Sequence, residues 1–310
     1  MMRLPIAITV AVVVCAVEVA VSGYQNDTKR GQDQLQAQVP EPPMAGIHWA
    51  RGRAPARPHG GSPNLIYHGG PVMTNGAYVE PIYWGARWND STFVGDKITG
   101  LQAFYSGFGV SSYGDTNSEY TDSSGTHVGS AVTLASGHVD LSAAPTNGNK
   151  TSTILAEVCS TANNLRADGY YPVYVDTRRG HAGFCAWHSA GTCSNGTTVQ
   201  FAFFFNLDGD AGCDPDDTSG QHSQGTAALG NVSGHELSEA LTDPHLNAWY
   251  DANGQENSDK CAWAFGTPLL KLGQSQWKIQ GNWSNVAFNS NSGYANRSGQ
   301  NGCIDGGNYK

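Results

Sequence analysis

Apolar residues recur at helical spacing in three stretches of the chain. In residues 91–105 the stripe is formed by Val94, Ile98, Leu101 and Tyr105. Residues 151–167 show the same periodicity, and Thr151 or Ser152 can cap the helix. A third helix is predicted over residues 225–242 because Pro244 stops it.

Strand patterns lie between these helices. They are predicted at residues 64–68, 77–84, 131–134, 171–176 and 199–205. The last of these is an apolar run typical of a buried central strand. Strands and helices interleave without an internal repeat. The pattern therefore predicts an α+β fold, with one disulfide-stabilised domain built on a mixed sheet.

The first 22 residues have the pattern of a secretory signal peptide. Arg3 precedes an apolar run over residues 4–21, and Ala20-Val21-Ser22 offers a small-residue cleavage site. A membrane anchor is the alternative, but Glu18 lies inside the run, and a carboxylate in lipid is costly. We therefore expect a secreted, extracellular protein that is not membrane-bound after signal removal.

Residues 23–63 differ from the body in composition and charge. They are rich in Gln, Pro, Gly and Arg and carry five basic against three acidic residues, a charge of +2. The whole chain is −9 and the signal is neutral, so residues 64–310 carry −11. This contrast indicates a pro-segment or a disordered leader before an α+β domain at 64–310. The acidic body argues against a nucleic-acid partner.

Cysteine usage agrees with secretion. Six cysteines remain after the signal, at positions 159, 185, 193, 213, 261 and 303. An even number in an exported chain predicts disulfides, and six cysteines allow 15 connectivities. Cys185 and Cys193 are close enough in sequence to close a small loop, and Cys261 with Cys303 would join the C-terminal tail to the body. We expect these two pairs.

The predicted third helix carries the candidate chemistry. His235 and Glu239 are four residues apart, so they lie on one face and can offer an imidazole and a carboxylate to a shared cation. Glu236 sits beside them as a candidate general base, as in zinc peptidases with a His-Glu-x-x-His helix. The alternative is an amphipathic helix with a solvated polar face. Zinc is the first choice of ion, and because Glu239 replaces a His, manganese is the second.

Two other segments can complete this site. After the helix, a turn and a cysteine would fold Glu256 and Asp259 back towards it. Glu256 is the first choice as third ligand and Asp259 the second, and either can instead orient His235. Upstream, His188 is a candidate ligand or transition-state hydrogen-bond donor; the alternative is a buried structural histidine.

A second acidic cluster precedes the helix. Its carboxylates alternate in a glycine-containing loop, at Asp208, Asp210, Asp214 and Asp216. Such a loop can bind a structural calcium ion through several oxygens. A solvated acidic turn is the alternative.

Several of these stretches resemble one family. Residues 67–72 and 82–85 are similar to the N-terminal signature of phosphate-induced, EXORDIUM-type extracellular proteins and their bacterial and fungal relatives. Residues 183–188 resemble the family's central Cys/His segment, and residues 233–250 its helix and exit. Residues 256–261 match its downstream acidic stretch. The resemblance implies a secreted, cell-wall-associated protein with a shared metal site, without implying catalysis.

Two functions follow from these patterns. The leading hypothesis is a secreted metal-dependent hydrolase, a peptidase acting on extracellular peptides or proteins. The alternative is a non-enzymatic extracellular protein that binds cell-wall glycans or another protein. Its contacts would come from aromatic residues, several of Trp84, Trp88, Trp249, Trp263 and Trp283.

Overall fold

The computed structural model describes residues 41–55 and 62–307. The predicted signal peptide and residues 23–40 of the leader lie outside the described residues, as do 56–61 and 308–310. Residues from Glu41 onward form one compact unit.

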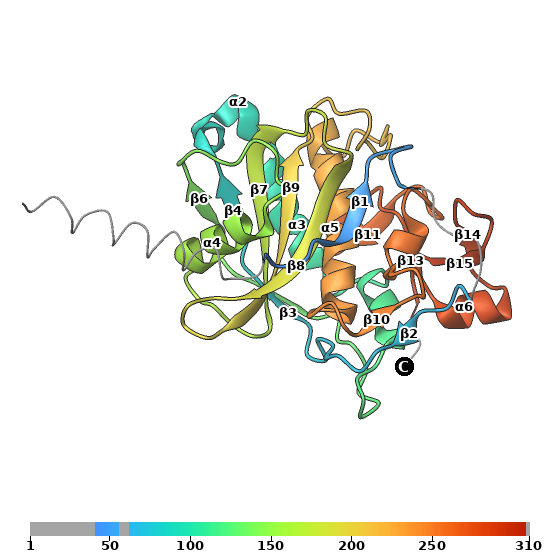
Figure 1. Cartoon of the computed structure of the whole chain (residues 1–310). Helices are drawn as coiled ribbons and strands as arrows, with labels where there is room; N and C mark the ends of the chain where they lie inside the picture. Colours follow the sequence, from blue (N-terminus) through green and yellow to red (C-terminus); the bar gives the residue numbers. More distant parts are fainter. Residues whose placement is uncertain (1–40, 56–61, 308–310) are drawn as a thin grey trace, which may run out of the picture. The chain divides into compact units, whose positions relative to one another are not determined.

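The centre of this unit is a mixed sheet of eight strands with the path β1-β8-β9-β7-β3-β5, to which β4 and β6 are added (Figure 1). β3, β4, β7 and β9 pair in parallel, whereas β8 runs antiparallel to β9 and β1 antiparallel to β8. The strands are β1 (Ala45–Trp49), β3 (Ala77–Val79), β4 (Ile82–Trp84), β5 (Val132–Leu134), β6 (His138–Asp140), β7 (Gly169–Arg178), β8 (Phe184–Thr192) and β9 (Thr198–Asn206). The predicted α+β domain with a mixed sheet is confirmed.

The helices follow the apolar periodicity with shifted ends. The first predicted helix is broken at Gly95, whose φ of +50° ends α2 (Ser91–Val94) before α3 (Lys97–Phe108) begins. α4 (Thr151–Thr161) is shorter than predicted, and α5 (Gln224–Thr242) matches its prediction. No periodicity predicted β8, where polar residues interrupt the apolar pattern.

Strand alternation divides the sheet into two faces. Tyr174 stacks on Phe204 and donates or accepts a hydrogen bond with Ser233 of α5, so these rings face α5 and α3. On the opposite face Trp187 stacks on Phe203, on the side covered by α4 (Figure 1). Because His188 follows Trp187 in β8, it points towards α5.

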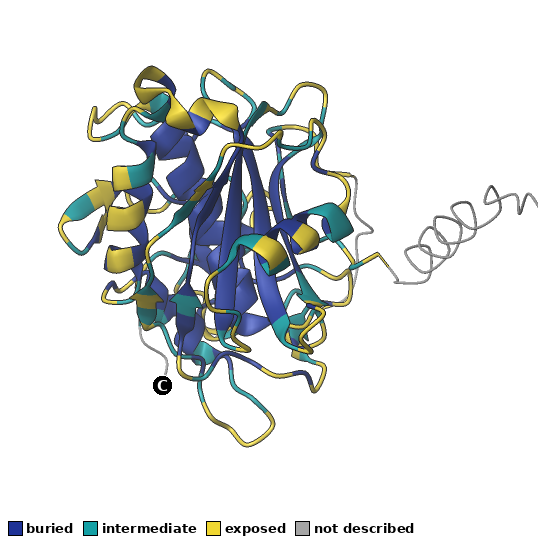
Figure 2. Ribbon diagram, turned by 90° about the vertical axis from the view of Figure 1, so that its left-hand side faces the viewer, coloured by how far each residue is buried: buried dark blue, intermediate teal, exposed yellow. Residues whose placement is uncertain are grey.

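α5 is buried on every side. All its residues from Gly225 to Thr242 are buried, and the central strands are buried as well (Figure 2). Gly230 allows this, since a Cβ there would lie 2.3 Å from the Trp277 ring. None of the helices formed by residues 41–55 and 62–307 combines the length and the apolar character needed to cross a bilayer.

Short elements from both halves of the chain lie beside this core. They are η1 (Ala86–Asn89), η2 (Gly114–Glu119), β2 (Ile66–Tyr67) paired with β10 (Trp249–Tyr250), η3 (Asp259–Cys261), β11 (Leu270–Leu272) paired with β12 (Ser275–Trp277), α6 (Asn285–Ser290), and the sheet of β13 (Asn282–Trp283), β15 (Asn301–Ile304) and β14 (Tyr294–Ala295).

Three disulfides join these parts. Cys261–Cys303 forms as predicted, next to η3. The predicted pair of Cys185 with Cys193 is wrong, because Cys185 lies in β8 and the rest of that strand, residues 186–192, separates it from Cys193. An extended strand rises about 3.3 Å per residue, which places its ends far beyond the 4.4–6.8 Å that a disulfide spans between Cα atoms. Cys185 pairs instead with Cys213, and Cys193 with Cys159. Three disulfides are consistent with an oxidising compartment.

The described part of the leader belongs to the sheet. Residues 45–49 form β1, the edge strand beside β8. Upstream, the Glu41 carboxylate accepts a hydrogen bond from the Ser152 amide at the start of α4. Composition placed these residues outside the fold, whereas hydrogen bonding to β8 and α4 places them in it.

Candidate metal centre

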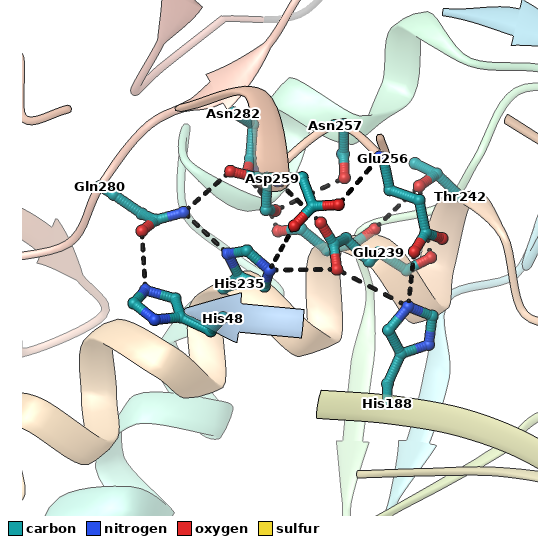
Figure 3. A network of polar contacts seen from close by, with 12 residues as sticks. His48, His188, His235, Glu239, Thr242, Glu256, Asn257, Asp259, Gln280 and Asn282 are labelled. Carbon is teal, nitrogen blue, oxygen red and sulfur yellow. Dashed lines mark hydrogen bonds and ion pairs between the residues drawn. The ribbon is translucent and has the colours of Figure 1, made fainter. Parts of the chain in front are cut away.

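Side chains from three segments converge beside β8. α5 contributes His235, Glu236 and Glu239, and β8 contributes His188. The turn after β10 contributes Glu256 and Asp259, as the sequence predicted (Figure 3). We call these six residues the His-Glu cluster.

The cluster is compact enough to share one ion. His235 Nε2 lies 3.2 Å from Glu239 Oε2 and 3.7 Å from Asp259 Oδ1. His188 Nε2 lies 3.6 Å from the same Glu239 oxygen and 3.0 Å from Glu256 Oε2. Donors bound tetrahedrally at 2.0–2.2 Å are separated by about 3.2–3.6 Å. The observed spacings therefore match a shared divalent ion.

Glu239 links two overlapping ligand sets. One consists of His235, Glu239 and Asp259, and the other of His188, Glu236 and Glu239, each with donor atoms within 4.8 Å of one another. Glu239 is fixed through its other oxygen, which accepts a hydrogen bond of 2.8 Å from the Asp259 amide. This bond holds the turn against the helix and brings Asp259 to His235.

Several buried polar atoms of the cluster lack a hydrogen bond. Among the described residues, neither carboxylate oxygen of Glu236 has a hydrogen-bond partner, nor does Glu256 Oε1 or His188 Nδ1. Buried carboxylates without partners cost several kcal/mol, about 1–3 for each unsatisfied group. A divalent cation offsets that cost, so the residues present fit such an ion.

Electrostatics within the cluster point the same way. Burial raises the pKa of Glu236 well above its ordinary value, and the neighbouring carboxylates of Glu239, Asp259 and Glu256 add to it. Burial likewise raises the pKa of Glu256 to about 7. Burial alone would lower the pKa of His188, but Glu256 and Glu239 outweigh it and raise this pKa to about 9. The cluster concentrates negative charge that His188 balances only in part.

A second layer of hydrogen bonds fixes His235. The Gln280 amide nitrogen donates to His235 Nδ1 (2.9 Å) and to the Ser258 carbonyl (3.0 Å), while its oxygen contacts His48 Nε2 at 2.9 Å. His235 thus accepts at Nδ1, and its neutral form carries the proton on Nε2. Ion binding at Nε2 requires that proton to move to Nδ1, which in turn requires the Gln280 amide to turn over. Burial lowers the pKa of His235 to about 4. The ring therefore stays neutral, both as the acceptor of the Gln280 hydrogen bond and as a ligand of an ion.

The predicted calcium loop does not converge in this way. Asp208 pairs with Lys97 at 3.0 Å, Asp210 with Arg179 at 2.7 Å. Asp216 pairs with Arg51 at 2.8 Å, and Asp214 Oδ1 accepts the Asp216 amide. Each carboxylate has its own donor, so the geometry supports a loop held by ion pairs and gives calcium no support.

Sequence reasoning missed four contributors. Gln280 and His48 gave no motif, and Gly46, which lies against the cluster, was in the compositional leader. Asp243, directly before Pro244 at the end of the helix, was not singled out, yet its carboxylate accepts the amides of Asn247 and Ala248 at 2.6 Å and so directs the chain after α5. Only the Asp-Pro pair that ends the helix could have drawn attention to it.

No protein-family model matches the chain, and no curated protein matches it in sequence.

Proposed function

We propose that the protein is a secreted metal-dependent hydrolase that cleaves peptide bonds in extracellular peptides or proteins. The observation that supports this most is the placement of Glu236. Its buried carboxylate lies close enough to donor atoms of His188 and Glu239 for the three to hold one metal ion. Glu236 directly follows His235 in α5. A general base must lie beside the ion, within hydrogen-bond reach of the attacking water.

The proposed roles follow from the donor set. His235 and Glu239 hold the ion, with Asp259 and His188 as the nearest further donors and Glu256 paired to His188. A bound zinc or manganese ion would polarise a peptide carbonyl and lower the pKa of water. Glu236 accepts the proton of the attacking water and returns it to the leaving amine. His188, if it does not bind the ion, donates a hydrogen bond to the developing oxyanion.

The glycan-binding alternative loses most of its contacts. Trp84, Trp88 and Trp283 are buried, so they cannot stack on a sugar at the surface. Trp263 donates its indole N–H to the Trp49 carbonyl and packs against His48. Trp249 and Trp263 are half-buried, and the indole N–H of Trp249 donates to the Thr121 carbonyl, so three of the five tryptophans belong to the core and the other two are already hydrogen-bonded to the chain.

The resemblance to EXORDIUM-type proteins bears on the metal rather than on the reaction. Its segments include the start of β8 with His188 and the end of α5 with His235 and Glu239. We propose that such relatives share the cluster, and that secretion to the cell surface is common to them.

The test is Glu236→Gln, which keeps the size of the side chain and removes its basicity. We expect peptide hydrolysis to fall by about 10²–10⁴ in kcat, with metal content and melting temperature unchanged. Glu157→Gln on α4 is the matched control, since Glu157 lies on the other face of the sheet. Full activity in Glu236→Gln would contradict the proposed mechanism.

A further inference from the structure

β1 crosses the His-Glu cluster at Gly46. Gly46 has a φ of +50°, and a Cβ placed on it would lie 2.0 Å from Glu239 Oε2 and 2.4 Å from His188 Nε2. The peptide backbone at Gly46 therefore rests directly on two proposed ligands. Any side chain at this position would overlap them.

This contact seals the centre. His235, Glu236 and Glu239 have no exposed surface, and His188 is 1% exposed. A cleft of about 570 Å³ reaches Asp259, and Ile47 and Trp49 of β1 form part of its wall. A hydrolase must admit its substrate, so with β1 in place the cluster is closed to a peptide.

β1 has the geometry of a bound peptide. It is an edge strand, and it pairs antiparallel with β8, the strand that carries His188. Its register is interrupted between Ala45 and His48 and again between His48 and Trp49. Extended peptides bind protein sheets by adding a strand to such an edge. Removal of β1 would leave β8 as the free edge.

Besides its pairing with β8 and the buried side chain of His48, the segment is held by polar contacts at its two ends. Arg51 forms an ion pair of 2.8 Å with Asp216 and also donates to the Asp214 carbonyl. At the other end the Pro43 carbonyl accepts from the Ser189 hydroxyl at 2.6 Å. Gly52 to Pro55, which follow Arg51, are exposed. Arg51 of the basic leader thus lies on the acidic loop, in line with its opposite charge.

We infer that residues 41–55 occupy the substrate groove of the protein, and that an extended peptide binds antiparallel to β8 in the place of β1. The residue over His188 and Glu239 must be glycine, as Gly46 is here. The segment keeps the secreted chain inactive until it is cut from the body or displaced. The inference rests on the proposed function for its description of the ligand as a substrate.

The experiment uses the full mature chain with a site-specific protease sequence inserted after Pro55. One readout is independent of catalysis: a fluorescent peptide of residues 41–53 is added before and after cutting, and binding is followed by anisotropy. We expect exchange of the labelled peptide into the cut protein only, because a tethered segment competes at a high effective concentration. The same peptide with Gly46→Val should bind at least about tenfold more weakly, equivalent to about 1.4 kcal/mol.

The second readout is peptide hydrolysis by the uncut protein, the cut protein and uncut Gly46→Val. We expect activity to rise at least about tenfold on cutting, again about 1.4 kcal/mol, and to rise in uncut Gly46→Val. Gly52→Val is the matched control: Gly52 also has a positive φ, of +70°, but a Cβ there meets no atom within 4 Å. Its activity should stay at the uncut level.

The outcomes separate the two proposals. Specific peptide exchange without hydrolysis supports the groove and overturns the hydrolase. Hydrolysis that is equal before and after cutting overturns the groove and leaves the hydrolase standing. Failure of the peptide to exchange into the cut protein also overturns the groove. If Gly46→Val does not fold, the cut wild-type chain still decides the question.

Discussion

Two acidic regions of the molecule are alike in composition and opposite in organisation. In the loop at 208–217 the carboxylates meet Lys97, Arg179 and Arg51, each paired with a separate aspartate. In the His-Glu cluster the carboxylates converge on two imidazoles, with donor atoms 3.0–3.7 Å apart. Three of the loop's five aspartates therefore have a cation of the protein beside them. The cluster instead brings donor atoms together at spacings that fit a cation, and this difference distinguishes a structural acidic segment from a candidate metal site.

The two regions also differ in how the chain holds them. Cys213 ties the loop to β8, whereas Cys261 ties the turn with Asp259 to Cys303 in β15. The turn has few regular elements of its own, since η3 is three residues long. The position of Asp259 therefore depends on this disulfide and on the hydrogen bond of its amide to Glu239.

The largest expected effect comes from that disulfide. Replacing Cys261 and Cys303 by Ala opens a link with a sequence separation of 42 and should cost about 4 kcal/mol of stability. Affinity for zinc should also fall, because Asp259 is no longer held. The control is the Ala pair at Cys159 and Cys193, with a separation of 34 and a similar cost. Denaturant unfolding measures the stability of both variants, and zinc titration measures their affinity for zinc. Equal zinc affinity in the two variants would show that the Cys261–Cys303 disulfide does not position the site.

A smaller effect is expected in the acidic loop. Asp210 accepts two hydrogen bonds from Arg179, at 2.7 and 2.8 Å, in a half-buried position. Asp210→Asn should lower the free energy of unfolding by about 1–3 kcal/mol, because charge-assisted hydrogen bonds are lost. Metal content should not change. A loss of bound metal in this variant would show that the two regions are not separate in function.

Sequence patterns predicted those features of the two acidic regions that depend on local spacing. α5 was predictable from its apolar face and Pro244, and the i, i+4 relation placed His235 beside Glu239. The return of Glu256 and Asp259 was also predicted, because a turn and a cysteine follow the helix. The cations that pair with the loop were not predicted. Lys97, Arg179 and Arg51 come from distant segments, and an ion pair between distant segments has no sequence spacing that could reveal it.

β1 and β8 show the other limit of sequence reasoning. Residues 41–55 have a leader's composition, and their place beside β8 depends on a long-range pairing. Both faces of β8 are covered, one by α4 and one by α5, which would favour an unbroken apolar run, but polar residues interrupt that pattern. Its polar His188 is there for the cluster rather than for the core.

The smallest predicted effect concerns the face of the sheet opposite the cluster. Burial raises the pKa of Glu157 on α4 to about 7, with a further contribution from Asp140 opposed by the Thr161 hydroxyl. Because this pKa is higher in the folded state, folding favours the protonated form of Glu157. Its contribution to the free energy of unfolding is fully present below the ordinary pKa of 4.5 and is lost as the pH rises through about 7. Glu157→Gln should therefore flatten the fall of the melting temperature between pH 5 and pH 8. An unchanged slope would assign that pH dependence to other groups.

The central claim is that the His-Glu cluster binds a divalent ion, and metal content measures it most directly. Mass spectrometry on the purified protein, cut after Pro55 and uncut, should find about one zinc or manganese ion per chain. The ion should be absent from Glu239→Gln, which has the same size and stays folded by circular dichroism, and present in Asp210→Asn. A folded wild-type protein that contains no transition metal after incubation with zinc, in both the cut and the uncut form, would contradict the account.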